Sequence, residues 1–437
     1  MTSSNDQNST TNAESLKLRA RRTFSSLKVR NYRLWFIGQT TSLCGTWMQS
    51  VAQGLLVLRL TNNSGLALGL VFALQQLPVL VFAPYGGLLA DRVSKRHLLY
   101  VTQALAGLLA FLLGVLVLLG AVQLWMVFVI AGLLGLVNAA DNPARQTFVH
   151  EMVGRKQLGN AVTLNSIIVN LSRVIGPAIA VVIVAQFGLA PCFIINGVSF
   201  GAVLYCLFVM DGSLLHKSEP VRAAKGQLRE GFAYAWNTPL LRDVLLMMAL
   251  VGTLTYEFMV SLPILGKVTF SGGEPAVGIL TCAMGVGAVI GGLVTAGRPT
   301  STMRTLTIGS FGFGASVVLV ALAPSLVTGA IAIAIVGFFS VWFTSLTNTI
   351  LQLWSEPRMR GRVMALWSMG FLGSTVIGAP IIGWVCQFAG ARWGLAVGAV
   401  AALAAGVIGL RGMTAHDTGL ADRRAAAALV IQKEESA

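Results

Sequence analysis

The chain is 437 residues long and 55% hydrophobic, with only 11% charged residues and a formal net charge of +15. No polar stretch exceeds roughly forty residues, which is too short for an independent soluble domain. A basic charge balance is common in nucleic-acid-binding proteins. Here, however, the basic residues lie in short loops between long apolar runs. We therefore expect them to meet anionic membrane lipids and not nucleic acid.

Twelve apolar segments are long enough to cross a bilayer, since a helical crossing needs about twenty residues. In chain order they lie at 34–59, 66–90, 97–120, 123–143, 160–186, 190–210, 241–266, 275–297, 305–323, 326–350, 361–387 and 391–411. The sequence therefore predicts an all-α membrane protein with twelve transmembrane helices in two pseudo-symmetric six-helix bundles. Its predicted parts are a basic cytoplasmic N-terminal arm (1–30), a first bundle (31–210), a cytoplasmic linker (211–240), a second bundle (241–411) and a cytoplasmic C-terminal tail (412–437).

Positive charge is distributed unevenly between the two sides of these spans. Under this assignment, 27 of the 31 basic residues fall in the arm, the tail and the loops of one side. The exceptions are Arg59, Lys267 and Arg392 on the other side and Arg173 within a span. Loops rich in Lys and Arg remain in the cytoplasm. We therefore expect a multi-pass protein of the cytoplasmic (inner) membrane with both termini in the cytoplasm.

The linker and the two bundles carry further patterns. In the linker, Leu228, Phe232 and Trp236 recur every four residues, which predicts an amphipathic helix on the inner membrane surface. Two short stretches of the first bundle recur in the second, at offsets of 205 and 203 residues, and this indicates an internal duplication that is typical of secondary transporters. The paired stretches are Gly86-Gly87-Leu88-Leu89 with Gly291-Gly292-Leu293-Val294, and Val174-Ile175-Gly176-Pro177 with Ile377-Gly378-Ala379-Pro380.

The loop after the second span carries a family resemblance. It reads Gly87-Leu88-Leu89-Ala90-Asp91-Arg92-Val93-Ser94-Lys95-Arg96. This resembles the signature loop of the major facilitator superfamily, although Ser94 stands where glycine is usual. Three further stretches resemble its subfamily of enterobactin exporters and drug:proton antiporters, and the resemblance covers about residues 24–412. They are Gly45-Thr46-Trp47-Met48-Gln49, Asp141-Asn142-Pro143-Ala144-Arg145-Gln146 and Arg360-Gly361-Arg362-Val363-Met364.

The resemblance implies a gating role for this loop. Asp91 would face the N-terminus of the eleventh span, a favourable position for an anion, and would brace the outward-facing state. One of the loop cations Arg92, Lys95 and Arg96 would pair with Asp141, which is followed by Arg145. The alternative is a plain solvated loop.

A second motif, Arg173-Val174-Ile175-Gly176-Pro177, lies in the fifth span. Pro177 removes one backbone hydrogen bond and Gly176 allows close approach of another helix, so we expect a bend here. Similar glycine-proline sequences mark antiporters of the superfamily, although Ala180 and Val181 replace the usual glycines. Arg173 could bind an anionic group of the substrate or pair within the bundle.

Glu257 is the acid that lies deep in a predicted span, about midway along the seventh. A charge at that depth is costly and needs a partner or a wet cavity. The resemblance places this span beside the central cavity, together with spans 1, 4 and 10. Removal from water favours the neutral form of a carboxyl group, so Glu257 could exchange a proton for substrate. It could instead bind a cationic substrate, or form a structural hydrogen bond.

Several amides also lie within the spans, and amides in lipid must find partners. Lining of a cavity and bonding between helices both satisfy that need. The candidates for cavity lining are Gln49, Gln53, Asn165, Asn348 and Gln352.

Together these features predict a secondary active transporter, not an enzyme. We expect export of a small amphipathic molecule, siderophore- or drug-like, by alternating access in exchange for protons. No ATP-binding motif and no metal-ligand spacing occurs in the sequence, so we expect no cofactor and a proton gradient as the driving force. The expected partners are the substrate, protons and anionic lipids, with a monomer as the working unit. The alternatives are an importer or lipid flippase of the same fold, and a non-transporting receptor or scaffold.

Overall fold

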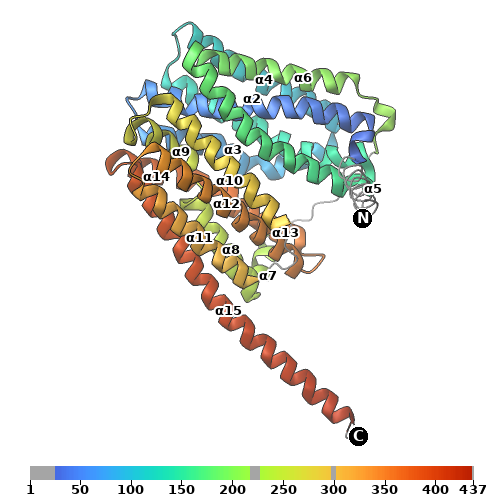
Figure 1. Cartoon of the computed structure of the whole chain (residues 1–437). Coiled ribbons are helices and arrows are strands. Elements are labelled where there is room, and N and C mark those ends of the chain that lie inside the picture. The colour runs from blue at the N-terminus through green and yellow to red at the C-terminus, as the bar shows by residue number, and fades with distance from the viewer. Residues whose placement is uncertain (1–24, 217–226, 297–301, 436–437) are drawn as a thin grey trace, which may run out of the picture. The chain divides into compact units, whose positions relative to one another are not determined.

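The computed structural model describes residues 25–216, 227–296 and 302–435. Within these ranges, side chains are described except at 83–84, 87–88, 90–91, 155–156, 227–228, 296 and 414–435. The described chain is helical and contains no β-strand (Figure 1). This confirms the all-α prediction.

The helices of the first half follow the predicted spans closely. They are η1 (Ser25–Lys28), α2 (Arg30–Leu60), α3 (Gly65–Arg92), α4 (Lys95–Leu118), α5 (Leu124–Phe187) and α6 (Ala190–Val209). The long α5 contains the fourth and fifth predicted spans. Between them Gly154 leaves the helical conformation with φ 67° and ψ 177°, a backbone shape that glycine adopts at little cost.

The second half begins with two short helices and ends with one long helix. The elements are η2 (Gly212–Leu214), α7 (Gln227–Asn237), α8 (Pro239–Leu254), α9 (Phe258–Ile264), η3 (Leu265–Thr269), α10 (Gly273–Ala296), α11 (Met303–Leu322), α12 (Leu326–Trp354), α13 (Arg360–Ser368), η4 (Met369–Gly373), α14 (Thr375–Phe388) and α15 (Ala391–Glu435). Here η3 and η4 are single π-helical turns within spans 7 and 11. The linker segment around Phe232 and Trp236 forms α7.

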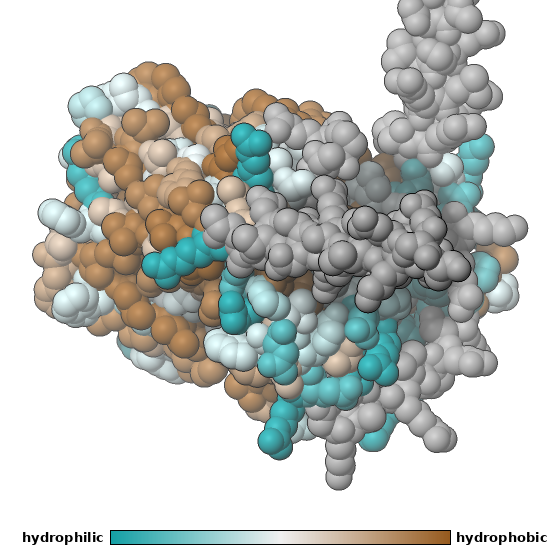
Figure 2. Space-filling model, turned by 90° about the horizontal axis from the view of Figure 1, so that it is seen from below, coloured by the Kyte–Doolittle hydropathy of each residue, from teal (hydrophilic) through white to brown (hydrophobic). Residues whose placement is uncertain are grey.

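Eleven helical segments of the described chain are long and apolar enough to cross a membrane, and they match predicted spans 2 to 12. Predicted span 1 lies in α2, a continuous helix of 31 residues. Its length of about 46 Å suffices for a crossing, but its amide and hydroxyl side chains lower its mean hydropathy. In the space-filling view, hydrophobic residues cover wide areas of the visible surface, as expected for helices that face lipid (Figure 2).

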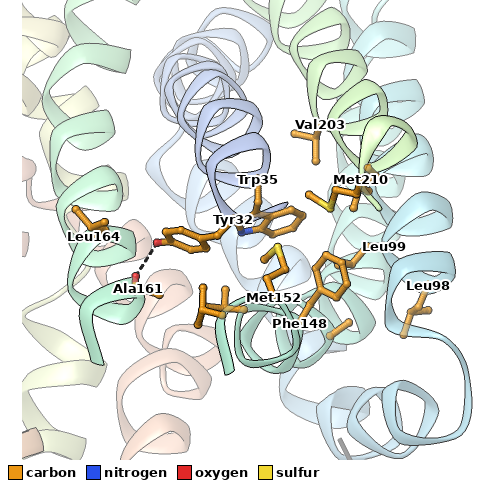
Figure 3. Close-up of a cluster of buried hydrophobic side chains, with 14 residues drawn as sticks. Tyr32, Trp35, Leu98, Leu99, Phe148, Met152, Ala161, Leu164, Val203 and Met210 are labelled. Atoms are coloured by element: carbon orange, nitrogen blue, oxygen red, sulfur yellow. Dashed lines mark hydrogen bonds between the residues drawn. The ribbon is translucent and has the colours of Figure 1, made fainter. Parts of the chain in front are cut away.

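The chain forms two compact units. The boundaries between them fall inside α2, α3 and α5, so each of these helices contributes residues to both units. The first comprises Met1–Ala52, Val81–Val122 and Leu133–Arg222, and the second comprises Gln53–Leu80, Gln123–Gly132 and Ala223–Ala437. In the first unit, Trp35 meets Phe148 edge to face with ring centroids 5.6 Å apart. Tyr32 donates a hydrogen bond from its hydroxyl to the carbonyl of Ala161 at 2.8 Å (Figure 3). This apolar cluster fixes α2 against α5 near the predicted gating loop.

Candidate functional site

The cations of the predicted gating loop are held by specific partners in the first unit. The Nζ of Lys95 lies 2.7 Å from the carboxylate of Glu151, and both side chains are about nine-tenths buried. Arg96 donates hydrogen bonds to the carbonyl of Leu207 at the end of α6, at 3.0 and 2.6 Å. A cation at that position also stabilises the helix dipole. Arg92 is exposed.

Asp141 forms a separate, fully buried network. Its Oδ1 accepts hydrogen bonds from Thr102 Oγ1 at 2.7 Å and from Gln103 Nε2 at 2.8 Å. Its Oδ2 is bound by the guanidinium of Arg145, one turn later on α5. The structure thereby joins α4 and α5 through Asp141.

The prediction that a loop cation pairs with Asp141 is wrong, because Lys95 pairs with Glu151 instead. The reason is the register of two consecutive helices that run in opposite directions. Lys95 lies about two turns before Thr102 on α4, and Glu151 lies nearly three turns after Asp141 on α5. The two pairs therefore lie at different levels. The side chains at 87 and 91 are outside the described set, so the predicted role of Asp91 stays a prediction.

The Arg173 motif joins α5 to α2. The guanidinium carbon of Arg173 lies 4.9 Å from the ring centroid of Trp47, a cation–π contact. A Cβ on Gly176 would lie 2.6 Å from the carbonyl oxygen of Cys44, so only glycine allows this approach. The chain remains helical through Pro177, and the non-helical residue within α5 is Gly154. Arg173 and Gly176 thus serve one helix-to-helix contact.

Glu257 lies where span 7 is interrupted, between α8 and α9. Its side chain is 4% exposed. Oε1 has no hydrogen-bond partner in the described structure, while Thr375 of α14 forms a side-chain hydrogen bond to the carboxyl group. The carboxyl borders a gap too narrow to admit a water molecule, and the walls of this gap come from α8, α9, α11, α14 and α15. All of these helices belong to the second unit, so the carboxyl lies inside that unit.

An aromatic cluster surrounds the same interruption. Tyr256 donates a hydrogen bond from its hydroxyl to the carbonyl of Ser340 on α12 at 2.5 Å. Its ring meets Phe313 and Phe371 edge to face, with centroids 5.4 and 5.1 Å apart. Phe371 lies in the π-turn η4, so the irregular parts of spans 7 and 11 contact each other. The sequence analysis missed this cluster, although the glycines at 370 and 373 and Pro263 were signals of irregular helix.

The amides proposed as cavity lining have mixed environments. Gln49 is 5% exposed and accepts a hydrogen bond from Asn196 of α6 at 2.6 Å, which is the helix-to-helix alternative. Gln352 is exposed and donates to Asn348 at 2.5 Å. Gln53 is 5% exposed and Asn165 is half-buried. A lining role for these amides stays a prediction.

Within the second unit, the connection between α2 and α3 is tightly bound to α10 and α14. Arg59 pairs with Glu274 at 2.5 Å, and Ser64 donates to Gln387 at 2.6 Å. Gly69 packs directly on the carbonyl of Ala379. These residues lie at the ends of the spans to which the sequence assigns few basic residues. No cluster of three or more metal-ligating side chains occurs in the described part of the chain.

Comparisons with known proteins give a consistent result. A family model described as transmembrane secretion effector matches residues 21–428. The staphyloferrin A transporter of Staphylococcus aureus is 24% identical over 339 residues, covering 74% of this chain and 82% of that protein. The multidrug efflux pump Tap of Mycolicibacterium fortuitum is 27% identical over 363 residues, covering 78% of this chain and 85% of that protein. The enterobactin exporter of Salmonella typhimurium is 25% identical over 357 residues, covering 80% and 84%.

Solved structures share the fold. A bacterial homologue of the iron transporter ferroportin in the inward-facing state superposes with a TM-score of 0.68 at 15% identity, covering 88% of this chain and 98% of that one. The nucleoside transporter NupG superposes with a TM-score of 0.66 at 12% identity, covering 89% and 98%. These likenesses concern the fold alone.

Proposed function

Because the chain belongs to the transmembrane secretion effector family of the major facilitator superfamily, we propose that it exports a small amphipathic molecule across the inner membrane in exchange for protons. The proposed substrate is siderophore- or drug-like, as the names of the relatives suggest. Family membership makes the chain a multi-pass membrane transporter and not an enzyme.

The observation that supports proton exchange is the environment of Glu257. Its carboxyl group is buried, and one oxygen has no hydrogen-bond partner among the described residues. An ionised carboxylate in such a place is costly, whereas a protonated one gains a donor that can bind a backbone carbonyl exposed by the helix interruption. Uptake and release of one proton would therefore change how α8 and α9 pack against α14.

The tightly bound connection between α2 and α3 supports alternating access, because its contacts can break and re-form in a cycle. We place the basic loops and both termini in the cytoplasm, and in the proposed cycle the substrate enters from that side. Separation of Arg59 from Glu274 and of Gly69 from Ala379 would open the other side. A single chain contains both repeats, so a monomer suffices as the working unit, with protons and anionic lipids as its further partners.

Transport in proteoliposomes tests the proposal. We expect a siderophore or drug from a screened panel to release protons from an acidic lumen as it enters, with a dye reporting lumenal pH. Glu257→Gln should lower gradient-driven transport at least about tenfold, roughly 1.4 kcal/mol in the barrier. The matched control is Glu356→Gln, which changes an exposed acid between α12 and α13 and should transport as the parent does.

Three outcomes would contradict the proposal. Substrate movement without proton flux in the parent excludes exchange. Gradient-driven transport that survives Glu257→Gln excludes that residue as the proton carrier. Accumulation of the compound in cells that carry the gene, relative to cells that lack it, indicates an importer, and movement of labelled phospholipid between leaflets indicates a flippase.

A further inference from the structure

The linker helix α7 carries two large apolar side chains that the protein leaves half exposed. Phe232 is 54% exposed and Trp236 is 50% exposed. Their rings stack, with centroids 5.5 Å apart and planes inclined by 18°. α7 has eleven residues and is too short to cross the membrane. Exposed aromatic side chains on such a helix are typical of one that lies at the membrane interface.

The opposite face of α7 is bound to α13 (Figure 1). The carboxylate of Glu230 lies 2.6 Å from the guanidinium of Arg362. Gly231 packs closely on the same arginine, because a Cβ added to Gly231 would lie 2.6 Å from the Cβ of Arg362. The hydroxyl of Tyr234 accepts a hydrogen bond from the backbone N–H of Glu356 at 3.2 Å. These contacts fix the rotation of α7 about its own axis, so Phe232 and Trp236 point away from α13.

Phe232 and Trp236 form one wall of a groove of about 390 Å³. The remaining walls come from α3, α8, α13, η4 and α14, through residues that all belong to the second unit. The groove begins at Arg242 in the first turn of α8 and extends along η4 to Ile377, and the side chains between are almost all apolar. Its volume is in the range of ~300–1,000 Å³ that is usual for small-molecule sites. A groove that is charged at one end and apolar along its length suits an amphipathic ligand.

The segments at the charged end carry an excess of positive charge. Four arginines, at 229, 242, 360 and 362, stand against two acids, Glu230 and Asp243, which leaves two positive charges in excess. The side chain of Arg242 is 39% exposed and contacts Asp243 through Nε at 3.2 Å. Its position at the mouth of the groove favours a negatively charged head group.

A second groove gives a useful contrast. It lies between α10 and α12, measures about 720 Å³, and is lined by apolar residues such as Ile279, Ile331 and Phe338. No charged side chain lines it. It can accept acyl chains from any lipid, but it has no group that would distinguish one head group from another.

We propose that the groove beside α7 binds one anionic phospholipid of the leaflet on the basic side, with its phosphate at Arg242 and an acyl chain between Trp236 and Ile377. The bound lipid covers the stacked aromatic pair and completes the apolar surface of spans 7 and 11. This site differs from the gap beside Glu257, because no residue lines both of them. The proposal depends neither on proton exchange nor on the direction of transport.

Lipid binding by the purified full chain tests the proposal. Native mass spectrometry should show one tightly retained phosphatidylglycerol and no equivalent phosphatidylcholine. Arg242→Gln should weaken retention at least about fivefold, roughly 1 kcal/mol. The control Arg304→Gln, an exposed cation at the start of α11, should leave retention unchanged. Phosphatidylglycerol brominated in its acyl chains should quench tryptophan fluorescence, and Trp236→Phe should remove that quenching while keeping an aromatic ring.

The following results would overturn the proposal. Equal retention of phosphatidylglycerol and phosphatidylcholine would show acyl-chain binding without head-group recognition. An equal loss of phosphatidylglycerol retention in Arg242→Gln and Arg304→Gln would show that the lipid is attracted diffusely to the basic side of the protein. Undiminished quenching in Trp236→Phe would place the lipid elsewhere. Displacement of the lipid by inorganic phosphate would show a simple anion site, and displacement by a transported compound would show that the groove belongs to the substrate path.

Discussion

The glycine-proline stretches of the two repeats each bring a glycine against the backbone of another helix of the same unit. In the first unit, Gly176 of span 5 packs on the backbone of α2 at Cys44. In the second, Gly378 of span 11 packs on the backbone of α8 at Thr253. In both places a missing side chain lets the fifth helix of a repeat touch the first.

Around these equivalent contacts the two units differ in how charge is held. In the first unit, Lys95 is paired with Glu151 and Arg173 lies over Trp47. In the second, span 7 is interrupted, span 11 contains a π-turn, and Glu257 keeps one oxygen without a partner in the described structure. The buried charged groups of the first unit, Lys95, Asp141 and Glu151, all have partners, whereas the second unit combines irregular backbone with a buried carboxyl oxygen that has none in the described structure. Under the proposed function, the second copy is the one that would respond to protons.

Breaking the buried ion pair of the first unit should have the largest effect on stability. Glu151→Gln or Lys95→Met leaves one buried charge without its partner and should cost about 3–5 kcal/mol. Thermal unfolding in detergent measures this loss, and the double variant Lys95→Met/Glu151→Leu should recover most of it. Glu257→Gln provides the contrast, because it removes an unsatisfied charge and should unfold at or above the parent temperature. Equal destabilisation by Glu151→Gln and Glu257→Gln would end the distinction between the units.

Adding a methyl group at the two glycines compares the helix contacts directly. A Cβ at position 378 would overlap the carbonyl oxygen of Thr253, whereas at position 176 it would lie 2.6 Å from that of Cys44. We expect Gly378→Ala to cost more than Gly176→Ala, within about 1–3 kcal/mol for each. Gly132→Ala is the control, since nothing lies within 4 Å of its added Cβ. A larger loss at 176 than at 378 would contradict the order.

Replacement of the arginine over Trp47 should have the smallest effect. Arg173→Gln removes the cation and should cost about 0.5–2 kcal/mol, while Arg173→Lys should retain part of the interaction. A double-mutant cycle with Trp47→Leu isolates the pair from other contacts of Arg173. A coupling energy near zero would show that the ring and the guanidinium are neighbours without a stabilising interaction.

The features that the sequence predicts well are those summed over many residues. Hydropathy over about twenty residues identifies each span, and eleven of the twelve segments are confirmed as apolar helices of sufficient length. The repeated glycine-proline stretches indicated the paired close contacts, because only a small residue permits backbone approach. The depth of Glu257 within span 7 also followed from counting residues along the span.

The features that the sequence left open depend on contacts between helices. Lys95 pairs with Glu151 and not with Asp141, and the register of α4 against α5 decides between these two acids. The interruption before Glu257 occurs where Tyr256 is bound to the carbonyl of Ser340, a residue more than eighty positions away. Neither arrangement leaves a local pattern, so single-sequence reasoning could not have specified them.

The glycine seam between α3 and α14 has a consequence for how the protein responds to salt. Gly65 and Gly383 meet backbone to backbone, and Gly69 rests on Ala379 in the same way. Because shape complementarity holds this seam, external salt should scarcely change its strength, apart from screening of the half-exposed Arg59. Such a closure could work equally well in dilute and in saline surroundings.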